Sequence, residues 1–450
     1  MTRVITYGTF DLFHEGHRRL LERARTLGDY LIVGVTSEGY DDARGKLNVH
    51  DSLVERIRKV TESGLADEVI VEEAEGQKIQ DIQRYEIDVF AIGSDWDGKF
   101  DYLGDYCDVV YLDRTRGVSS TALRQAQGVI RLGVVGAGRI ANRFVRESRY
   151  VSGADAELVW TRDPAKARAF AESHSLRGAS ETYEELLANV DAVYIATPHE
   201  THVPYARQAL DAGRHVLCEK PMALHVEEAS ALYELADARG VVLLEALKTA
   251  FAPGFQRMVA IARGGTIGSI RSVDATFTKL IRHGRELDSP VGGAITELSS
   301  YPLLAIIKLL GDAPTELTSR AYHPHGSRVE QFARIDLEYP HAIASATVGI
   351  RVKSEGQLVV SGTRGYLYVP APWWLTEYFE TRFEDPRENR KYYFKYDGDG
   401  LRYELAEFLG MIRDGASESF KLRRHESIAL ARLMERARTA PRVFGAAKED

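Results

Sequence analysis

The stretch RLGVVGAGRIANRFVRES, residues 131–148, joins a short apolar run, a glycine turn and a helical pattern. Gly136 permits a tight turn, Gly138 lets the backbone approach a pyrophosphate, and the small Ala141 takes the third glycine position of the motif. The pattern predicts the first strand–turn–helix unit of a dinucleotide-binding fold. Its predicted cofactor contacts are Gly136, Gly138, Arg139 and Ile140.

Similar units lie on both sides of this stretch. Apolar runs of strand length alternate with helical patterns before it, from residue 3 to about 127, and after it, to about residue 250. This alternation is typical of parallel sheets covered by helices on both faces. Beyond residue 250, segments such as 269–280 and 342–350 alternate with period two, as half-buried antiparallel strands do.

The chain is therefore expected to have an α/β fold in three domains. Residues 1–127 are predicted to form a Rossmann-like domain, and residues 128–250 a Rossmann dinucleotide-binding domain. Residues 251–450 are predicted to form an α+β domain with a large, mainly antiparallel sheet, whose C-terminal helices return to the Rossmann domain. A length of 450 residues fits this division, since one core serves roughly 150 residues.

The composition excludes several classes of protein. With a net charge of −8, nucleic acid or an anionic membrane is not expected as the main partner. Two cysteines, Cys107 and Cys218, are too few for a disulfide framework or a cysteine-built zinc site. No apolar run is long enough for a transmembrane helix, and the start of the chain reads as a strand. We therefore expect a cytoplasmic protein.

The segment GTFDLFHEGH, residues 8–17, places two histidines at a predicted helix start. His14 and His17 are three residues apart, so they share one face of the first turn. Unpaired backbone N–H groups and the positive dipole end at such a turn suit phosphate, and two imidazoles can donate to a triphosphate and stabilise a leaving pyrophosphate. On spacing alone, a metal-binding pair or an incidental turn is also compatible with this motif.

Other polar segments follow the neighbouring strands. Residues 44–46 follow the second strand, Asp95 and Trp96 the fourth, and residues 114–121 the last strand before a helix. Open α/β sheets bind ligands at the carboxyl ends of their strands. We therefore expect these segments to complete a phosphate-binding site with the histidine pair.

Five segments cover most of the first domain: ITYGTFDLFHEGH (5–17), LLERARTLGDYL (20–31), DVFAIGSDWDGKFDYL (88–103), VVYL (109–112) and RTRGVSST (114–121). Through these segments the domain resembles the glycerol-3-phosphate cytidylyltransferase family. The resemblance implies attack of a polyol phosphate on CTP, with Mg²⁺ present and pyrophosphate leaving. It implies catalytic roles for His14, His17, Lys46 and Arg114. It implies CTP contacts for Thr9, Phe10, Asp11, Arg44, Asp95, Thr115, Ser119, Ser120 and Thr121.

One position departs from that family. Ser63 and Gly64 occupy the stretch where the family usually has an arginine, shortly before its DEV strand. If that arginine grips the acceptor phosphate, the acceptor here differs from glycerol 3-phosphate, or Arg56 and Arg58 replace it.

The second strand of the dinucleotide-binding unit ends in Trp160-Thr161-Arg162, with Asp163 only after the arginine. NAD enzymes usually carry an acid at the strand end for the ribose diol, whereas a hydroxyl and a guanidinium suit a 2′-phosphate. We therefore favour NADP(H) over NAD(H).

Two further strands end in Ala196-Thr197-Pro198-His199 and in Glu219-Lys220-Pro221. A lysine at such a strand end can act as an acid or polarise a carbonyl. A surface lysine held by Glu219 is the alternative. The predicted cofactor contacts of this half are Thr161, Arg162, Thr197, Pro198, His199, His202, Glu219 and Lys220.

Through GVVGAGRIA (133–141) and ATPHETHVPYARQALDAGRHVLCEKPMAL (196–224), residues 129–440 resemble the glucose–fructose oxidoreductase/inositol dehydrogenase family. The family's Glu-Lys-Pro lysine maps onto Lys220. In the stretch that follows Gly292 and Gly293, Glu297 stands where aspartate is usual and Tyr301 where many members have histidine. We predict that Lys220, Glu297 and Tyr301 meet the substrate and that Tyr301 passes the proton. A merely packed tyrosine is the alternative.

The fusion suggests a bifunctional enzyme that reduces a keto-sugar phosphate and transfers the product to CTP. The expected product is a CDP-polyol such as CDP-glycerol, a donor for teichoic-acid-like or capsule polymers. An oxidoreductase that acts on the CDP-linked sugar, or a cofactor-binding sensor domain without turnover, are the alternatives. The expected partners are small molecules and a second copy of the chain, in a homodimer or higher oligomer.

Overall fold

The computed structural model describes residues 1–43, 46, 47, 49, 51–74, 76–113, 129–439 and 441–445. The chain divides into two compact units, residues 1–193 and 194–450. The predicted α/β fold is confirmed, whereas the exact domain boundaries stay a prediction. Arg44, Arg114, Thr115, Ser119, Ser120 and Thr121 lie outside the described residues, as does the helix predicted after the last strand of the first domain.

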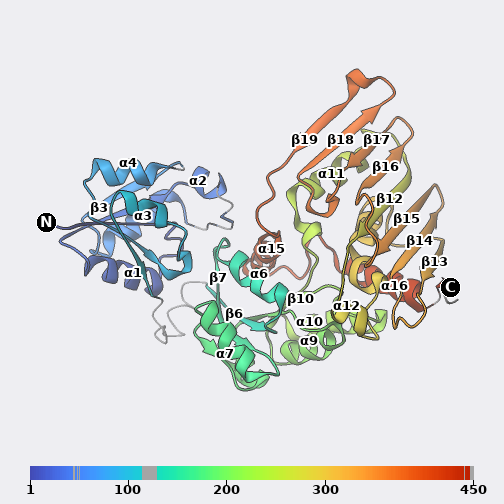
Figure 1. Cartoon of the computed structure of the whole chain (residues 1–450), viewed down its shortest axis with the longest axis horizontal. Coiled ribbons are helices and arrows are strands. Elements are labelled where there is room, and N and C mark those ends of the chain that lie inside the picture. Colours follow the sequence, from blue (N-terminus) through green and yellow to red (C-terminus); the bar gives the residue numbers. More distant parts are fainter. Residues whose placement is uncertain are drawn as a thin grey trace. The chain divides into compact units, whose positions relative to one another are not determined.

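In the described part of the first domain, parallel strands form a five-stranded sheet (Figure 1). In spatial order the strands are β3 (Glu68–Glu72), β2 (Tyr30–Thr36), β1 (Arg3–Gly8), β4 (Val89–Gly93) and β5 (Asp108–Leu112). The connecting helices and 3-10 turns are α1 (Glu15–Arg25), α2 (Glu38–Ala43), α3 (Leu53–Glu62), α4 (Gln77–Arg84), η1 (Ser94–Trp96) and η2 (Asp101–Asp105).

Alternating side chains of β1 explain why both faces of this sheet are covered. Val4 packs into one core cluster with Leu21 of α1. Ile5, the next residue, packs into a second cluster with Ile82 of α4. Successive strand residues point to opposite faces, so a continuous apolar run needs a helix on each side. This arrangement leaves the carboxyl ends of the strands for polar residues.

A second sheet follows, with six strands among the described residues. Its order is β11 (Leu243–Ala246), β10 (His215–Glu219), β9 (Ala192–Ile195), β6 (Ile130–Val135), β7 (Ala154–Trp160) and β8 (Gly178–Ala179). The helices and turns between these strands are α6 (Arg139–Ser148), α7 (Pro164–Ser173), α8 (Tyr183–Asn189), η3 (His199–Thr201), α9 (His202–Asp211) and α10 (Val226–Arg239).

The third sheet has nine strands within the described ranges. Its order is β19 (Arg390–Tyr393), β18 (Tyr378–Phe383), β17 (Gly365–Val369), β16 (Leu358–Gly362), β12 (Ile270–Thr278), β15 (Ala342–Gly349), β14 (Phe332–Tyr339), β13 (Glu316–Tyr322) and β20 (Arg442–Phe444). Most pairs are antiparallel, as predicted, but β12 runs parallel to β15 and β13 parallel to β20. The strands β13 and β18 were not singled out from the sequence.

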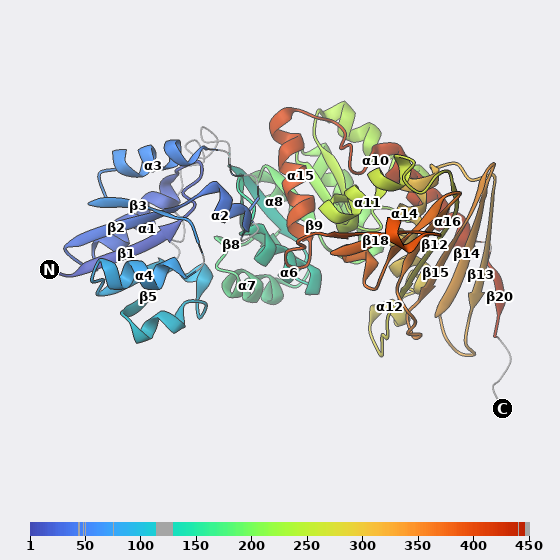
Figure 2. The same ribbon diagram turned by 90° about the horizontal axis from the view of Figure 1, so that it is seen from above.

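Several helices and 3-10 turns accompany this sheet along the chain. They are η4 (Lys248–Phe251), α11 (Pro253–Arg263), α12 (Arg285–Asp288), α13 (Ala294–Leu298), α14 (Ser300–Leu310), η5 (Trp373–Leu375), η6 (Pro386–Glu388), α15 (Leu401–Asp414) and α16 (Arg424–Thr439). Helix α14 packs on β12 and β15, and α16 packs on β13 (Figure 2). Helix α16 also contacts α10, so the end of the chain returns to a helix of the dinucleotide-binding half. Across the described residues, we find no helix with the length and apolarity needed to span a bilayer.

Candidate functional sites

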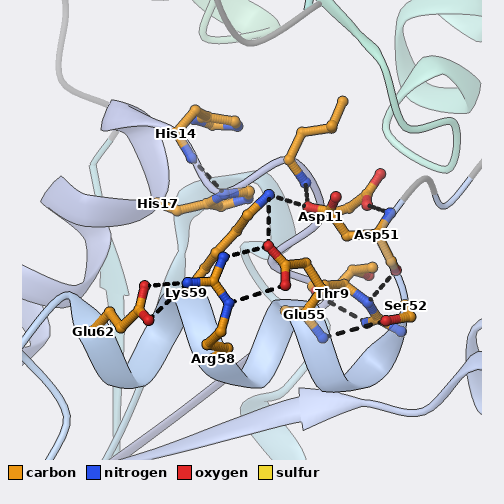
Figure 3. Close-up of polar contacts among 12 residues, drawn as sticks. Thr9, Asp11, His14, His17, Asp51, Ser52, Glu55, Arg58, Lys59 and Glu62 are labelled. Carbon is orange, nitrogen blue, oxygen red and sulfur yellow. Dashed lines mark hydrogen bonds and ion pairs between the residues drawn. The ribbon is translucent and has the colours of Figure 1, made fainter.

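The histidine pair forms a reciprocal cap at the start of α1 (Figure 3). His14 is the N-cap residue, and its Nδ1 accepts a hydrogen bond from the Gly16 amide at 3.0 Å. The His14 amide donates in turn to Nδ1 of His17 at 3.4 Å. The two rings stack with their centroids 3.8 Å apart. The spacing therefore places both imidazoles together at the helix start, as predicted.

These bonds assign the protons of the imidazoles. Because each Nδ1 accepts from an amide, a neutral ring carries its proton on Nε2. Burial lowers the pKa of His17 well below its usual value, and the nearby His14 and Lys46 lower it further. Two of the amides expected to meet phosphate are thus bonded to imidazoles. The ring Nε2–H groups, rather than these amides, are the donors that this turn offers a phosphate.

The loop before the histidines is a tight turn. Phe10 and Leu12 adopt positive φ angles of 53° and 47°, which non-glycine residues rarely do outside constrained sites. Asp11 holds the turn through its Oδ1, which accepts from the Asp51 amide at 2.7 Å. The Phe10 side chain is part of the core, with 1% exposed. Only the Phe10 backbone is thus left for the predicted nucleotide contact.

Thr9 is fixed by a buried ion pair that the sequence analysis missed. Its Oγ1 donates to Asp41 Oδ1 at 3.0 Å, and its backbone oxygen accepts from Arg56 at 2.9 Å. Arg56 and Asp41 lie 3.3 Å apart with both side chains fully buried. A buried charge pair of this kind is costly to break. It therefore holds the end of β1 in place beneath the histidine pair.

These contacts show that Arg56 does not replace a missing acceptor arginine, whereas the suggestion for Arg58 stays a prediction. Arg56 is inaccessible and committed to Asp41 and to the backbone oxygens of Thr9 and Thr36. Arg58 lies on the exposed side of α3, where it pairs with Glu55 and Glu62 (Figure 3). The burial of Arg56 could not be read from the sequence, because an arginine in an amphipathic helix normally lies at its surface.

Lys46 and Asp95 both contact Arg149, which directly follows α6. The Lys46 ammonium donates to the Arg149 backbone oxygen at 2.8 Å. The Arg149 guanidinium donates to the Asp95 backbone oxygen at 2.8 Å and lies 3.5 Å from the Asp95 carboxylate. The contacts of Lys46 and Asp95 with CTP stay predictions.

The glycine turn has the geometry expected for a dinucleotide. Gly136 adopts a φ of 104°, and Gly138 is the N-cap residue of α6, without a side-chain cap. A Cβ added at Gly138 would meet nothing within 4 Å, so a ligand has room at this backbone. Arg139 and Ile140 form the first turn of α6, and Ala141 is buried. These residues therefore fit the pyrophosphate of a nicotinamide dinucleotide.

Asp163, the acidic residue after β7, caps a helix. Asp163 is the N-cap residue of α7, and its Oδ1 accepts from the amides of Ala165 and Lys166 at 3.0 and 3.2 Å. The side chain of Arg162 is exposed beside it, and Thr161 directly follows the strand. Asp163, the acid that follows this strand end, is thus engaged in helix capping.

Lys220 lies at the centre of a buried polar cluster within residues 194–450. Its ammonium donates to the Glu297 backbone oxygen at 2.9 Å and lies 5.4 Å from the centre of the Tyr301 ring. Glu219 is buried and accepts from the Tyr194 hydroxyl at 2.8 Å. Burial raises the pKa of Glu219, although Lys220 and Tyr194 oppose the shift. Lys220 is therefore held in place by the backbone rather than by a salt bridge to Glu219.

Glu297 and His199 form a buried pair beside this lysine. His199 Nε2 lies 3.0 Å from Glu297 Oε1. Burial disfavours the charge of Glu297, but the bond from His199 and the nearby Lys220 and Arg285 outweigh it and lower its pKa to about 2. Burial lowers the pKa of His199. We therefore describe the pair as a carboxylate that accepts from a neutral imidazole, with glutamate doing this where aspartate is usual.

Tyr301 lies on α14 with 9% of its surface exposed. Its ring meets Phe277 edge-to-face at 5.1 Å. Burial raises the pKa of its hydroxyl, as do the carboxyl groups of Glu219, Glu404 and Glu297. The structure thus brings together Lys220, Glu297 and Tyr301, the three residues predicted for the substrate. The proton is firmly held on the Tyr301 hydroxyl when no ligand is bound.

His202 is placed differently from His199. Its ring is fully buried between the Pro221 and Thr197 backbone oxygens, at 2.8 and 2.9 Å. Burial lowers its pKa to about 3. Both ring nitrogens therefore face backbone, so this geometry favours a role in positioning the two strand ends over direct contact with a cofactor.

Together, the fold and these side chains define a nucleotidyltransferase domain followed by a dinucleotide-dependent oxidoreductase. Comparison with family models agrees. Residues 5–126 match the cytidylyltransferase-like family, residues 130–247 the oxidoreductase family with the NAD-binding Rossmann fold, and residues 255–368 the GFO/IDH/MocA C-terminal domain.

Curated relatives match each half separately. Glycerol-3-phosphate cytidylyltransferase of Bacillus spizizenii is 51% identical over 125 residues, which are 28% of this chain and 96% of the relative. The Staphylococcus aureus enzyme is 45% identical over 130 residues, 28% of this chain and 94% of the relative. Trans-1,2-dihydrobenzene-1,2-diol dehydrogenase of Bos taurus is 30% identical over 324 residues, 69% of this chain and 96% of the relative.

A solved 3-ketoreductase from Actinomadura kijaniata, in complex with NADP and TDP-benzene, shares the fold of the oxidoreductase half. Its TM-score is 0.63 at 24% identity, and the match covers 70% of this chain and 99% of that one. The chain belongs to the cytidylyltransferase-like family and to the GFO/IDH/MocA oxidoreductase family, and it is a bifunctional enzyme. Both resemblances found in the sequence are thereby confirmed.

Proposed function

We propose that the enzyme reduces a keto-sugar phosphate with NADPH and transfers the cytidylyl group of CTP to the resulting polyol phosphate. The observation that carries this proposal is the presence, in one chain, of a cytidylyltransferase histidine pair and a lysine–tyrosine centre suited to carbonyl reduction. Cytidylyl transfer needs a polyol phosphate as acceptor, and reduction of a keto-sugar phosphate can supply one. Reduction of dihydroxyacetone phosphate, followed by formation of CDP-glycerol, is the simplest case, and a ketopentose phosphate is the next.

In the transfer step, an oxygen of the acceptor phosphate forms a bond to the α-phosphorus of CTP, and the bond to the pyrophosphate breaks. The Nε2–H groups of His14 and His17 donate to the phosphate oxygens on which charge develops. Lys46 neutralises the triphosphate, and no covalent enzyme intermediate is required. Mg²⁺ bound with CTP supplies further charge neutralisation.

When bound, NADPH would supply the hydride that the carbonyl carbon receives in the reduction step. The ammonium of Lys220 polarises the carbonyl oxygen, and the Tyr301 hydroxyl passes the proton to that oxygen. Glu297 supports this arrangement in two ways, because its backbone oxygen holds Lys220 and its carboxylate orients His199. The product is a hydroxyl group where the substrate had a ketone.

The preference for NADPH can be tested at Arg162. We expect Arg162→Ala to raise the KM for NADPH about 10–100-fold, because a charge-assisted bond to the 2′-phosphate is lost, while the KM for NADH changes little. Steady-state NAD(P)H oxidation measures both constants. Arg168→Ala removes another exposed arginine from the adjoining helix and should leave both constants unchanged. Equal weakening of the two cofactors by Arg162→Ala would refute the preference.

The whole proposal is tested with a panel of ketose phosphates, NADPH and CTP. We expect NADPH loss and the appearance of a CDP-polyol mass with the same substrate. NADPH loss with a CDP-linked sugar alone would favour the reverse order of steps, and no turnover of any ketone would favour a sensor domain.

We further propose that the product serves teichoic-acid-like or capsule polymers and that the enzyme acts in the cytoplasm as a homodimer.

A further inference from the structure

Arg285 is a cation beside the reduction centre. It belongs neither to the Glu219-Lys220-Pro221 segment nor to the stretch that follows Gly292 and Gly293. It opens the short helix α12, and its side chain is 37% exposed. One of its terminal nitrogens lies 3.4 Å from His199 Nε2 and 3.8 Å from Glu297 Oε1. The guanidinium therefore lies at the accessible side of the buried His199–Glu297 pair.

The bond between His199 and Glu297 limits what Arg285 can donate to within the protein. Glu297 is ionised and can only accept, so His199 Nε2 donates to it at 3.0 Å. A nitrogen that carries this proton has no lone pair for Arg285. The 3.8 Å separation from Glu297 exceeds the usual hydrogen-bond length. Within the described residues, one terminal nitrogen of Arg285 makes both of these contacts, to His199 and to Glu297, so its other N–H groups are available to a ligand.

Gly292 and Gly293 hold Arg285 at this position. The Gly293 amide donates to the Glu286 backbone oxygen at 2.9 Å. A Cβ added at Gly292 would lie 2.5 Å from that same oxygen, so a larger residue would push α12 away. The segment 279–285 that leads into α12 contains basic residues and no acidic one. Backbone packing therefore presents the Arg285 guanidinium beside His199 and Glu297, with Glu286 and Asp288 following it in α12.

From this geometry we propose that Arg285 binds a phosphate group of the oxidoreductase substrate and so sets the specificity of reduction. A guanidinium has planar, paired N–H donors that match phosphate oxygens. The inference rests on the proposed function, because it supplies the recognition that a keto-sugar phosphate requires. The same chemistry would recognise the diphosphate of a CDP-linked substrate, so the experiment must separate these two sources.

The experiment compares Arg285→Gln with the wild-type full-length chain in NADPH oxidation. With dihydroxyacetone phosphate, we expect kcat/KM to fall about 10–100-fold, mainly through KM, because charge-assisted hydrogen bonds are lost. With unphosphorylated dihydroxyacetone, the rate should change less than about twofold, since no phosphate is present. Arg285→Lys should recover part of the loss. Arg282→Gln, at an exposed arginine of the same segment, is the matched control.

A parallel arm follows NADP⁺ reduction with CDP-glycerol. A loss confined to dihydroxyacetone phosphate identifies a phosphate monoester, and a loss confined to CDP-glycerol identifies the diphosphate. An unchanged preference for phosphorylated over unphosphorylated substrate in Arg285→Gln overturns the inference while leaving the proposed function intact. An equal loss in Arg282→Gln also overturns it, because general charge would then explain the effect.

Binding gives a readout that does not depend on turnover. NADPH fluorescence reports on the oxidoreductase centre and not on the cytidylyl site, so glycerol 3-phosphate can be titrated into the NADPH-loaded full chain. We expect a saturable change in the wild type and binding at least about tenfold weaker in Arg285→Gln. Equal binding in both proteins, or no response in the wild type, refutes the role of Arg285 even if no ketose phosphate is reduced.

Discussion

Replacing His17 by alanine is expected to lower the rate of pyrophosphate release from CTP and its acceptor by about 10²–10³-fold, while NADPH oxidation stays at the wild-type rate. The expected size is that of losing one positioned donor to the charge of a transition state. Coupled release of inorganic phosphate by a pyrophosphatase measures the effect. Loss of both activities would instead indicate a shared site or misfolding.

Two milder variants separate the roles of the His17 ring. His17→Asn offers an acceptor near Nδ1 for the His14 amide but lacks the Nε2–H donor, so it should fold normally and stay inactive. His17→Gln offers a donor near Nε2 and should retain part of the activity. Because the pKa of His17 lies well below its usual value, the neutral ring should also survive acidification. The rate should therefore show no loss from His17 between pH 8 and about pH 6.5.

Replacing Lys220 by alanine should impair ketone reduction and leave cytidylyl transfer intact, the opposite of the result expected for His17→Ala. We expect kcat for ketone reduction to fall about 10²–10³-fold, because the positioned charge that polarises the carbonyl oxygen is lost, while pyrophosphate release is unchanged. Spectrophotometric NADPH oxidation at saturating ketone measures the loss. Normal NADPH consumption in this variant would rule out the role of Lys220.

Two further variants refine that result. Lys220→Arg keeps the positive charge that polarises the carbonyl but has no readily transferable proton, so it should recover part of the rate if Tyr301 passes the proton. Tyr301→Phe keeps the ring that packs on Phe277 and removes only the hydroxyl. If Tyr301 passes the proton, this variant should lose about as much rate as Lys220→Ala without a change in thermal stability. An active Tyr301→Phe enzyme would assign the proton to Lys220.

Arg56 lies in an environment that differs from the one its sequence pattern predicts. In the sequence, this residue belongs to an amphipathic helix and resembles an exposed cation available to an acceptor. In the structure it is fully buried and bonded to Asp41, Thr9 and Thr36. Local pattern shows which face of a helix is apolar, but it does not show which polar residue finds a buried partner. Arg285 was missed for a related reason, since no motif surrounds it.

The resemblances of the sequence to two families indicated the enzyme classes and Lys220, and the sequence pattern by itself determined the strand–turn–helix units and the placement of the histidine pair. These features depend on local geometry: a glycine turn, an apolar alternation and a three-residue spacing place side chains in the same way wherever they occur. Only the tertiary structure decided how those side chains are charged and held. Lys220 is held by a carbonyl 77 residues away, and His199 is paired with a carboxylate 98 residues away. Hydrogen bonds and burial between such distant segments set protonation, and these arise only when the chain has folded.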